Sequence, residues 1–359
     1  MYSIELVAKR LGLKFRKNGT RDSLYYDCPL CGDKRAKFNI NTKFHVWKCN
    51  VCGEGGGVVS LVEAVLCCSK DDAINFLRKN HLVTEQNLKN NHLKEEFLVQ
   101  EKIADEKTLD HTYRKMLDFL YISKPHLNSL LSRGFNYKSI EFFKFRSLPR
   151  NNDTTLPKKL LNAGCTLDGV PGFFKENNVW KINAFPQGFL IPFINTHGYI
   201  TGFQIRNDKP SENAGKYMSL SSTGKDYGTK SHIEAHLVGF NGQKAVYLTE
   251  GALKADLAYF ILRKRSKKEY AFLAIPGVNN TASLDAAFKH LKENGVETIV
   301  DAFDMDKIGN ESVIKNQRVT DAIEKIKNIA ESNGLSFKTI VWRKEKGIDD
   351  FLISKKKNH

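Results

Sequence analysis

Four cysteines near the start of the chain have the spacing of a metal site. Cys28 and Cys31 form one C-x2-C pair, and Cys49 and Cys52 form a second pair 17 residues further on. Each pair makes a tight knuckle that directs two sulfur atoms at one point, and four thiolates are a common ligand set of structural zinc. The spacing therefore predicts one structural Zn²⁺ per chain. Four unligated thiols are the poorer alternative.

Acidic residues form a second group with possible chemistry, in the last third of the chain. Asp304 and Asp306 end the run ETIVDAFDMD, Glu250 ends KAVYLTE, and Asp349 and Asp350 lie in KGIDDFL. Crowded carboxylates repel one another unless a cation lies between them, and such oxygen ligands suit Mg²⁺ or Mn²⁺. Metal ions held in this way stabilise the oxygens of a phosphoryl transfer. All five acids are predicted metal ligands.

These residues belong to a strongly basic chain. It has 359 residues, a formal net charge of +16 and a mean hydropathy of −0.41. The charge predicts a polyanionic partner, nucleic acid before a membrane surface, with simple solubility as the alternative. No apolar run is long enough to span a membrane and the first residues lack a signal peptide's apolar core, so we expect a cytoplasmic protein.

The zinc knuckles must be held by a small β-hairpin. The 17 residues between them alternate polar and apolar side chains over AKFNIN and FHVWK, which is the pattern of paired strands. Basic residues interleaved with aromatic ones can bind phosphates and stack on unpaired bases. Predicted DNA contacts are Arg35, Lys37, Lys43 and Trp47. Alternatively, two of the three aromatics Phe38, Phe44 and Trp47 form the core of the ribbon, with His45 outside the metal set.

The acidic residues must be held by a different architecture. From residue 244 the predicted strands KAVYLTE, AFLAIPG, ETIVDAFD and KTIVWRK (338–344) alternate with the predicted helices 252–264, 283–294 and 310–333. This order indicates a mainly parallel sheet flanked by helices, and sites in such sheets form beyond the carboxyl ends of the strands. Asp301 precedes Asp304 by three residues, on the opposite strand face, and is predicted to be structural.

The middle of the chain supplies candidate cations. Residues 188–206 read as a β-hairpin around His197 and Gly198, and they are followed by KYMSLSS and HLVGF. Arg206 and Lys216 are predicted to bind nucleotide or template, and Lys225 is a weaker candidate. The alternative for Arg206 is a strand end that faces water. Cys67 and Cys68 are expected to be small buried apolar residues.

Several of these segments resemble the DnaG-type primases. The segment CPLCGDKRAKFNINTKFHVWKCNVCGEGGGVVSLVEAV resembles their zinc-binding domain, although Cys31 stands where the family commonly has His. LLSRGFNYKSIEFFKF is similar to the segment that opens their polymerase domain. FDMDKIGN and KGIDDFL are similar to "FDGDRAGR" and "KDPDEYL" of their TOPRIM domain. Lys254 departs from the pattern, because the family usually has Asp four residues after the Glu that corresponds to Glu250.

The resemblance implies a DNA primase that makes short RNA primers on single-stranded DNA from nucleoside triphosphates. It implies catalytic roles for Glu250, Asp304, Asp306 and Asp349, and Lys254 as a candidate phosphate ligand. The alternatives are a TOPRIM-type nuclease and a zinc-dependent DNA-binding replication protein without catalysis. A primase from a mobile genetic element or virus, with a helicase or initiator supplied in trans, fits the absence of a P-loop. We expect a monomer.

The predicted fold class is α/β. A zinc ribbon over 1–80 and a linker over 81–110 precede a primase polymerase domain of α+β type. Residues 111–240 would form its basic part, and residues 241–359 its TOPRIM-type metal-binding part.

Overall fold

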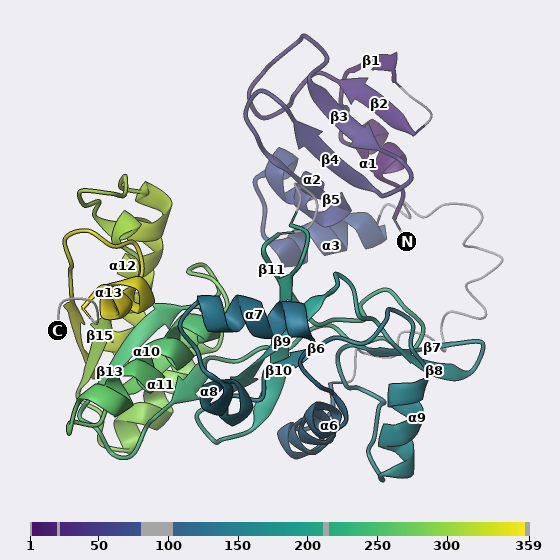
Figure 1. The fold of residues 1–359 in the computed structure, drawn as a ribbon. Helices are drawn as coiled ribbons and strands as arrows, with labels where there is room; N and C mark the ends of the chain where they lie inside the picture. The colour runs from purple at the N-terminus through teal and green to yellow at the C-terminus, as the bar shows by residue number, and fades with distance from the viewer. Residues whose placement is uncertain (1, 20–21, 80–102, 211–214, 356–359) are drawn as a thin grey trace. The chain divides into compact units, whose positions relative to one another are not determined.

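The computed structural model describes residues 2–19, 22–79, 103–210 and 215–355. The chain divides into two compact units, Met1–Gln100 and Glu101–His359 (Figure 1). Within the described ranges, no helix is both long and apolar enough to cross a membrane.

The first unit is a small antiparallel sheet with three helices. The sheet has the order β1-β2-β3-β4-β5, and consecutive strands pair antiparallel. Alternation in β3 buries Phe38 and Ile40, which pack with Trp47 of β4 and with the helices. The predicted ribbon hairpin is confirmed. The elements are α1 (Ile4–Arg10), β1 (Phe15–Asn18), β2 (Ser23–Tyr26), β3 (Phe38–Asn41), β4 (Val46–Cys49), β5 (Gly55–Gly57), α2 (Val58–Leu66) and α3 (Lys70–Lys79).

The expectation that Cys67 and Cys68 are buried is wrong. Cys67 is the left-handed residue that ends α2, with φ of 49°, and its side chain is exposed. Cys68 is half-buried. The apolar run that suggested burial ends with the helix, so the Cys67 thiol is exposed and Cys68 packs only partly against the core.

The second unit begins with an antiparallel sheet of order β11-β10-β9-β6. Both faces are covered, because Leu190 and Phe203 pack with α6 and α9 while Phe189 and Phe193 pack with α7 and α8. The predicted hairpin at His197 and Gly198 is confirmed as β9–β10. The elements are α6 (Glu106–Phe119), α7 (Lys124–Ser132), α8 (Tyr137–Phe142), β6 (Arg146–Ser147), α9 (Thr155–Asn162), the hairpin β7 (Phe173–Glu176) and β8 (Val179–Ile182), β9 (Gly188–Ile194), β10 (Ile200–Asn207) and β11 (Tyr217–Ser219).

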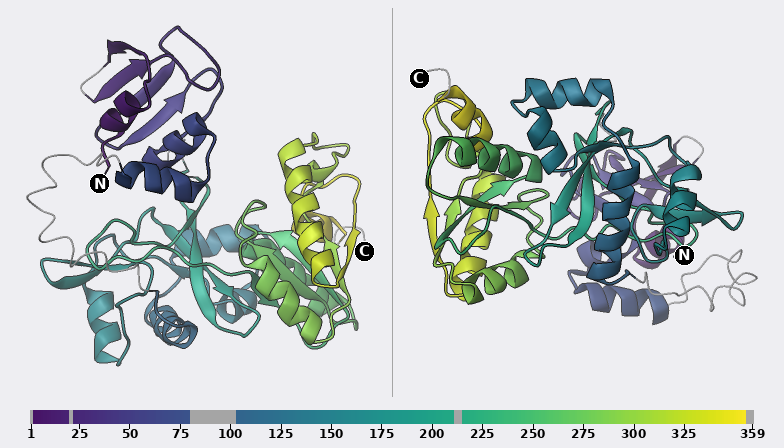
Figure 2. Two further views of the ribbon diagram at one scale, coloured as in Figure 1. Left: turned by 180° about the vertical axis from the view of Figure 1, so that it is seen from behind. Right: turned by 60° about the horizontal axis from the view of Figure 1, so that its bottom comes forward.

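A mainly parallel sheet of order β12-β14-β13-β15-β16 completes this unit. Strands β14, β13, β15 and β16 are parallel and β12 pairs antiparallel at the edge. Helices α10 and α13 pack with Phe272 and Ala274, and α11 and α12 pack with Leu273 and Ile275, so one layer of helices covers each face (Figure 2). The elements are β12 (His236–Val238), β13 (Ala245–Glu250), α10 (Ala252–Arg265), β14 (Ala271–Ile275), α11 (Leu284–Glu293), β15 (Thr298–Asp301), η2 (Met305–Lys307), α12 (Gln317–Ser332), β16 (Ser336–Thr339) and α13 (Ile348–Ser354).

Two predicted boundaries in this sheet are wrong. The last strand covers 336–339 rather than 338–344, because Trp342 leaves the sheet to donate its indole N–H to the carbonyl of Glu345. Residues 310–316 are not helical, and α12 begins at Gln317 after its cap Asn316.

The predicted linker over 81–110 is helical at its end. Asp105 caps α6 through hydrogen bonds from the N–H groups of Lys107 and Thr108, so residues 106–110 belong to that helix. Residues 81–102 of the predicted linker lie outside the described residues. The predicted parts 111–240 and 241–359 lie in one compact unit and share a hydrophobic core.

Candidate metal centre and catalytic site

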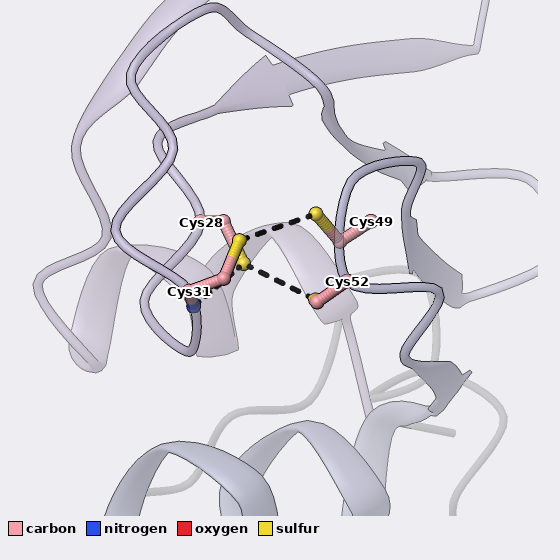
Figure 3. Close-up of side chains that lie close together, drawn as sticks. All are labelled: Cys28, Cys31, Cys49 and Cys52. Atoms are coloured by element: carbon pink, nitrogen blue, oxygen red, sulfur yellow. Dashed lines mark hydrogen bonds between the residues drawn. The ribbon is translucent and has the colours of Figure 1, made fainter.

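The four cysteines converge on one point. Their ligand atoms all lie within 4.8 Å of one another (Figure 3). The sulfur of Cys28 lies 3.9 Å from that of Cys52, and the sulfur of Cys31 lies 3.8 Å from that of Cys49. A tetrahedral Zn²⁺ bound at about 2.3 Å requires sulfur–sulfur edges of about 3.8 Å. The donor set and its spacing therefore fit zinc, as predicted.

Local backbone geometry holds these sulfur atoms in place. Each knuckle turns through a backbone hydrogen bond, from Gly32 to Cys28 and from Gly53 to Cys49, both at 3.0 Å. The N–H groups of Cys31 and Val51 point at sulfur atoms, at 3.5 and 3.4 Å. Burial raises the pKa of the Cys28 thiol to about 12. A bound cation would offset this cost and favour the thiolate.

The predicted role of Trp47 in contacting DNA is not supported by its position. Its side chain is 4% exposed, stacks on Phe38 at 5.2 Å and donates its indole N–H to the carbonyl of Gly57. Trp47 and Cys49 are two residues apart on β4, so both must face inward, a signal that the sequence already contained. Phe44 is the exposed aromatic, at 67%. The core alternative is thus confirmed for two of the three aromatics.

The predicted basic contacts of the ribbon are exposed. Arg35, Lys37 and Lys43 all lie at the surface of the first unit. Arg35 pairs with Asp33 at 2.6 Å, and the ammonium of Lys43 lies 5.5 Å from the centre of the Phe44 ring. A cation and an accessible ring therefore lie together on the hairpin.

The acidic residues come from three segments that meet at one edge of the parallel sheet. Glu250 is the last residue of β13, Asp304 and Asp306 follow β15, and Asp349 is in the first turn of α13. A Cβ built on Gly347 would lie 2.5 Å from Asp349 Oδ1 and 3.3 Å from Asp304 Oδ1. Asp350 Oδ2 would lie 3.7 Å from the same point. The fold thus brings these three acids around one glycine.

Cations lie between the acids. The ammonium of Lys254, in the first turn of α10, lies 2.5 Å from Asp304 Oδ1. Lys346 lies 3.4 Å from Asp306 Oδ2 and 3.8 Å from Asp304 Oδ2. The Arg133 guanidinium donates to Asp349 Oδ2 at 2.7 Å. The carboxylates are therefore compensated in part by the protein itself.

The acids do not converge as the cysteines do. Among the described residues, only the cysteine group has three or more ligand atoms within 4.8 Å of one another. One feature still fits a hard divalent cation: Asp349 Oδ1 is buried and no hydrogen-bond partner for it is found. An oxygen-rich set with an uncompensated buried oxygen is chemically suited to Mg²⁺ or Mn²⁺.

Burial and charge perturb the groups at this edge. Burial raises the pKa of Glu250, and the charges of Asp304 and Asp306 raise it further against the effect of Lys254. Burial lowers the pKa of Lys254, but the charge and hydrogen bond of Asp304 outweigh it, so that pKa lies above its ordinary value. Lys254 therefore stays an ammonium ion.

The predicted cations of the antiparallel sheet face this group. Burial lowers the pKa of Lys216, and so do the charges of Arg206, Arg133, Lys254 and Lys346. The Arg206 guanidinium lies 5.3 Å from the centre of the Tyr217 ring and reaches the carbonyl of Lys216 at 3.4 Å. One positive surface thus lies beside the acids, formed by Arg133 after α7, Arg206 on β10, Lys216 before β11 and Lys254 on α10.

Lys225 packs on the β7–β8 hairpin, and its role as the weaker candidate for binding nucleotide or template stays a prediction. Its ammonium lies 4.4 Å from the centre of the Phe174 ring, on the β7–β8 hairpin, and its charge acts on Glu176 of the same hairpin. The Gly-flanked turn that contains Lys225 thus packs on this hairpin.

Asp301 has the structural role that was predicted. It is fully buried and pairs with the buried Lys307 at 3.0 Å, and it accepts a hydrogen bond from the N–H of Phe303. Asp256, two residues after Lys254, points elsewhere on α10 and accepts a hydrogen bond from buried His236 at 2.9 Å. It therefore does not replace the missing acid at position 254.

Two residues beside the acids were not predicted. Arg133 is the arginine of LLSRGF and Lys346 is the lysine of KGIDD, so both belonged to segments already compared with the primases. Each could be found from its motif, but its pairing with an acid depends on long-range packing.

Comparisons with known proteins agree with this architecture. A family model described as a domain of unknown function (DUF3854) matches residues 238–359. The curated DNA primase of Lactococcus lactis subsp. lactis (strain IL1403) is 23% identical over 302 residues, which cover 80% of this chain. Those residues cover 44% of the relative, so the chain spans less than half of its length.

A solved structure extends the likeness over both units. The zinc-binding and RNA polymerase domains of the Aquifex aeolicus primase match with a TM-score of 0.52 and 16% identity, over 100% of this chain and 84% of that one. The chain has the fold of a DnaG-type primase. A DNA primase domain from Pseudomonas aeruginosa matches 69% of this chain, and 75% of that domain is covered, at 16% identity and a TM-score of 0.49. The four-cysteine ribbon and the α/β second unit are the two parts of the primase fold predicted above.

Proposed function

We propose that the protein is a DNA primase, a nucleotidyltransferase that makes short RNA primers on single-stranded DNA. The observation that carries this proposal is the edge of the parallel sheet, where acids from three segments face a positive surface formed by Arg133, Arg206, Lys216 and Lys254. Acidic residues alone would be compatible with metal binding in many kinds of enzyme. Acids beside a built positive surface suit a reaction in which a metal ion and a triphosphate meet.

Each group has a proposed role in joining two nucleotides. Glu250, Asp304, Asp306 and Asp349, with Asp350 beside them, would hold Mg²⁺ or Mn²⁺ in a TOPRIM-type arrangement. The bound metal would supply positive charge at the α-phosphate of the incoming nucleotide. The 3′-hydroxyl of the first nucleotide attacks that phosphorus, and pyrophosphate leaves.

The surrounding cations would position the substrates. Arg206 lies on β10 and Lys216 directly precedes the adjacent strand β11, where they can hold phosphate oxygens of a nucleoside triphosphate or of the template. The guanidinium of Arg133 keeps Asp349 in place through its hydrogen bond. This division gives the sheet cations a binding role and Arg133 a positioning role.

The zinc-bearing unit would bind the single-stranded template. Arg35, Lys37 and Lys43 supply exposed positive charge, and Phe44 supplies an accessible ring on which a base can stack. Phe44 takes the role first given to Trp47. We further propose a monomer in the cytoplasm that works with a helicase or initiator supplied in trans, as in a mobile genetic element.

A primer synthesis assay tests the proposal. The zinc-loaded chain would be incubated with single-stranded DNA, four ribonucleotides, one of them labelled, and Mg²⁺ or Mn²⁺. Asp304→Ala should abolish the short products, whereas Asp118→Ala, on the exposed side of α6, should not. Template cleavage without primers would favour a nuclease. Zinc-dependent DNA binding without either activity would favour a non-catalytic replication protein.

A further inference from the structure

Lys254 occupies an unexpected place for a basic residue. It lies in the first turn of α10, and that turn contains no acidic residue. A cation at a helix N-terminus opposes the helix dipole, so local preference does not explain it. Its side chain is 21% exposed and its ammonium lies 2.5 Å from Asp304 Oδ1. A tertiary ion pair with an acid of the proposed active site holds it there.

Gly347 is a second departure at the same point. The primase pattern "KDPDEYL" has Asp where this chain has Gly347 in KGIDDFL. A Cβ at that position would lie 2.5 Å from Asp349 Oδ1 and 3.3 Å from Asp304 Oδ1, so a larger side chain would require the acids to move. Relative to that pattern, the surroundings of Asp304 lose two negative charges, at positions 254 and 347, and gain one positive charge.

We propose that this site holds a single divalent cation and that the ammonium of Lys254 takes the place of a second one. Asp304 is shared: its Oδ1 faces Lys254, and its Oδ2 faces Lys346 at 3.8 Å. Lys346 is 54% exposed and long, so a metal ion can displace it at low cost. Lys254 is only 21% exposed, so its displacement by a metal ion would cost more.

The remaining acids define where the single ion binds. Glu250 and Asp306 lie close enough to Asp304 for their charges to act on one another. These three side chains, with Asp304 through Oδ2, would bind the ion together with Asp349. Asp349 turns its Oδ2 to Arg133 at 2.7 Å and keeps its buried Oδ1 for the ion, because no hydrogen-bond partner for that oxygen is found. The Lys254 ammonium then lies beside the ion, where it can contact a phosphate oxygen of the substrate.

The identity of that phosphate as part of a nucleoside triphosphate rests on the proposed function. The number of bound metal ions does not rest on it, because that number follows from the Lys254–Asp304 ion pair and from the acids missing at positions 254 and 347. A lysine in place of a metal ion also cannot exchange with solution. The site should therefore respond to the concentration of one divalent ion only.

Counting bound Mn²⁺ by electron paramagnetic resonance tests the proposal on the full zinc-loaded chain. The wild type should bind one Mn²⁺ per chain, and Asp306→Ala should remove it. Lys254→Asp restores the missing acid and should raise the count to two. Lys267→Asp makes the same charge change after the far end of α10, roughly 20 Å away along the helix, and should leave the count at one.

Two results would overturn the proposal. One is a wild type that binds two Mn²⁺ ions that both depend on Asp304, since a metal would then displace Lys254. This count is made on the wild type, so it does not depend on whether any variant folds. The other is a folded Lys254→Asp protein that still binds one ion. A wild type that binds one Mn²⁺ but makes no primers would refute the proposed function and leave this inference standing.

Discussion

The pair of Arg133 and Asp349 permits a sharp test of how the proposed active site is held together. These residues are 216 positions apart and join the end of α7 to the first turn of α13. The Asp349 side chain is 2% exposed and that of Arg133 is 27% exposed. Arg133→Met keeps most of the apolar stem and removes the charge, leaving a buried carboxylate with neither oxygen bonded to a side chain.

The structure sets the size of the expected loss. Two unit charges about 4 Å apart attract by about 4 kcal/mol at an effective dielectric constant of about 20. Breaking a fully buried pair costs about 3–5 kcal/mol, because the remaining charge is stranded. Since Arg133 is partly exposed, we expect Arg133→Met to lower the free energy of unfolding of the second unit by about 3 kcal/mol. In an Asp349→Asn background the same change should cost only about 1 kcal/mol, because no buried charge is left behind.

Native-state hydrogen exchange provides the assay. The amides of β13 and β15 lie in the middle of the parallel sheet and report opening of the second unit alone, whatever the first unit does. Arg318→Met, at an exposed position of α12, is the matched control and should change the free energy by less than about 0.5 kcal/mol. The reasoning is refuted if the two site changes are additive to within about 0.5 kcal/mol, which is the behaviour of uncoupled residues.

Four further predictions concern the zinc ribbon and an ion pair in the second unit. Cys49→Ser, or removal of zinc by a chelator, should abolish exchange protection in β3 and β4 but not in β13, because the small first unit depends on its metal; retained protection in β3 would contradict this. Phe38→Ala should destabilise the first unit by about 3–5 kcal/mol by leaving a cavity in its core. Phe44→Ala should leave stability nearly unchanged and weaken binding of single-stranded DNA by about 1–3 kcal/mol, as measured by fluorescence anisotropy. The hydrogen bond with Glu234 raises the pKa of His232, and the same bond lowers that of Glu234, so the pair stabilises the fold below the ordinary His pKa of 6.5 and above the ordinary Glu pKa of 4.5. Denaturation curves should therefore show His232→Gln costing up to about 1 kcal/mol at pH 5.5 and less at pH 8.5; an equal cost at both values would exclude the pair as its cause.

The sequence was most informative where a pattern is local. The spacing of the cysteines predicts the zinc site, because each knuckle closes within a few residues and the hairpin between them is short. Alternation predicts β9 and β10, and the order of strands and helices predicts the parallel sheet. The position of Glu250 and Asp304 at the carboxyl ends of β13 and β15 follows from that order alone.

Most errors arose where the local sequence is compatible with two structures and long-range packing decides between them. The basic and aromatic composition of the hairpin suggested a surface role for Trp47, although its spacing from Cys49 on β4 already placed it inside. The last strand ends before Trp342, whose indole N–H donates to the carbonyl of Glu345, and the alternation of apolar residues does not predict that hydrogen bond.

The sequence by itself determined which groups this protein has available: four thiolates with the spacing of a zinc site, and acids at strand ends, in a basic chain. Only the tertiary structure decided which charges meet. Lys254 and Asp304 are 50 residues apart and Arg133 and Asp349 are 216 apart, so no local pattern encodes either pair. Side chains distant in the chain pair when the burial of apolar faces brings their backbones together, and that burial is a property of the whole second unit.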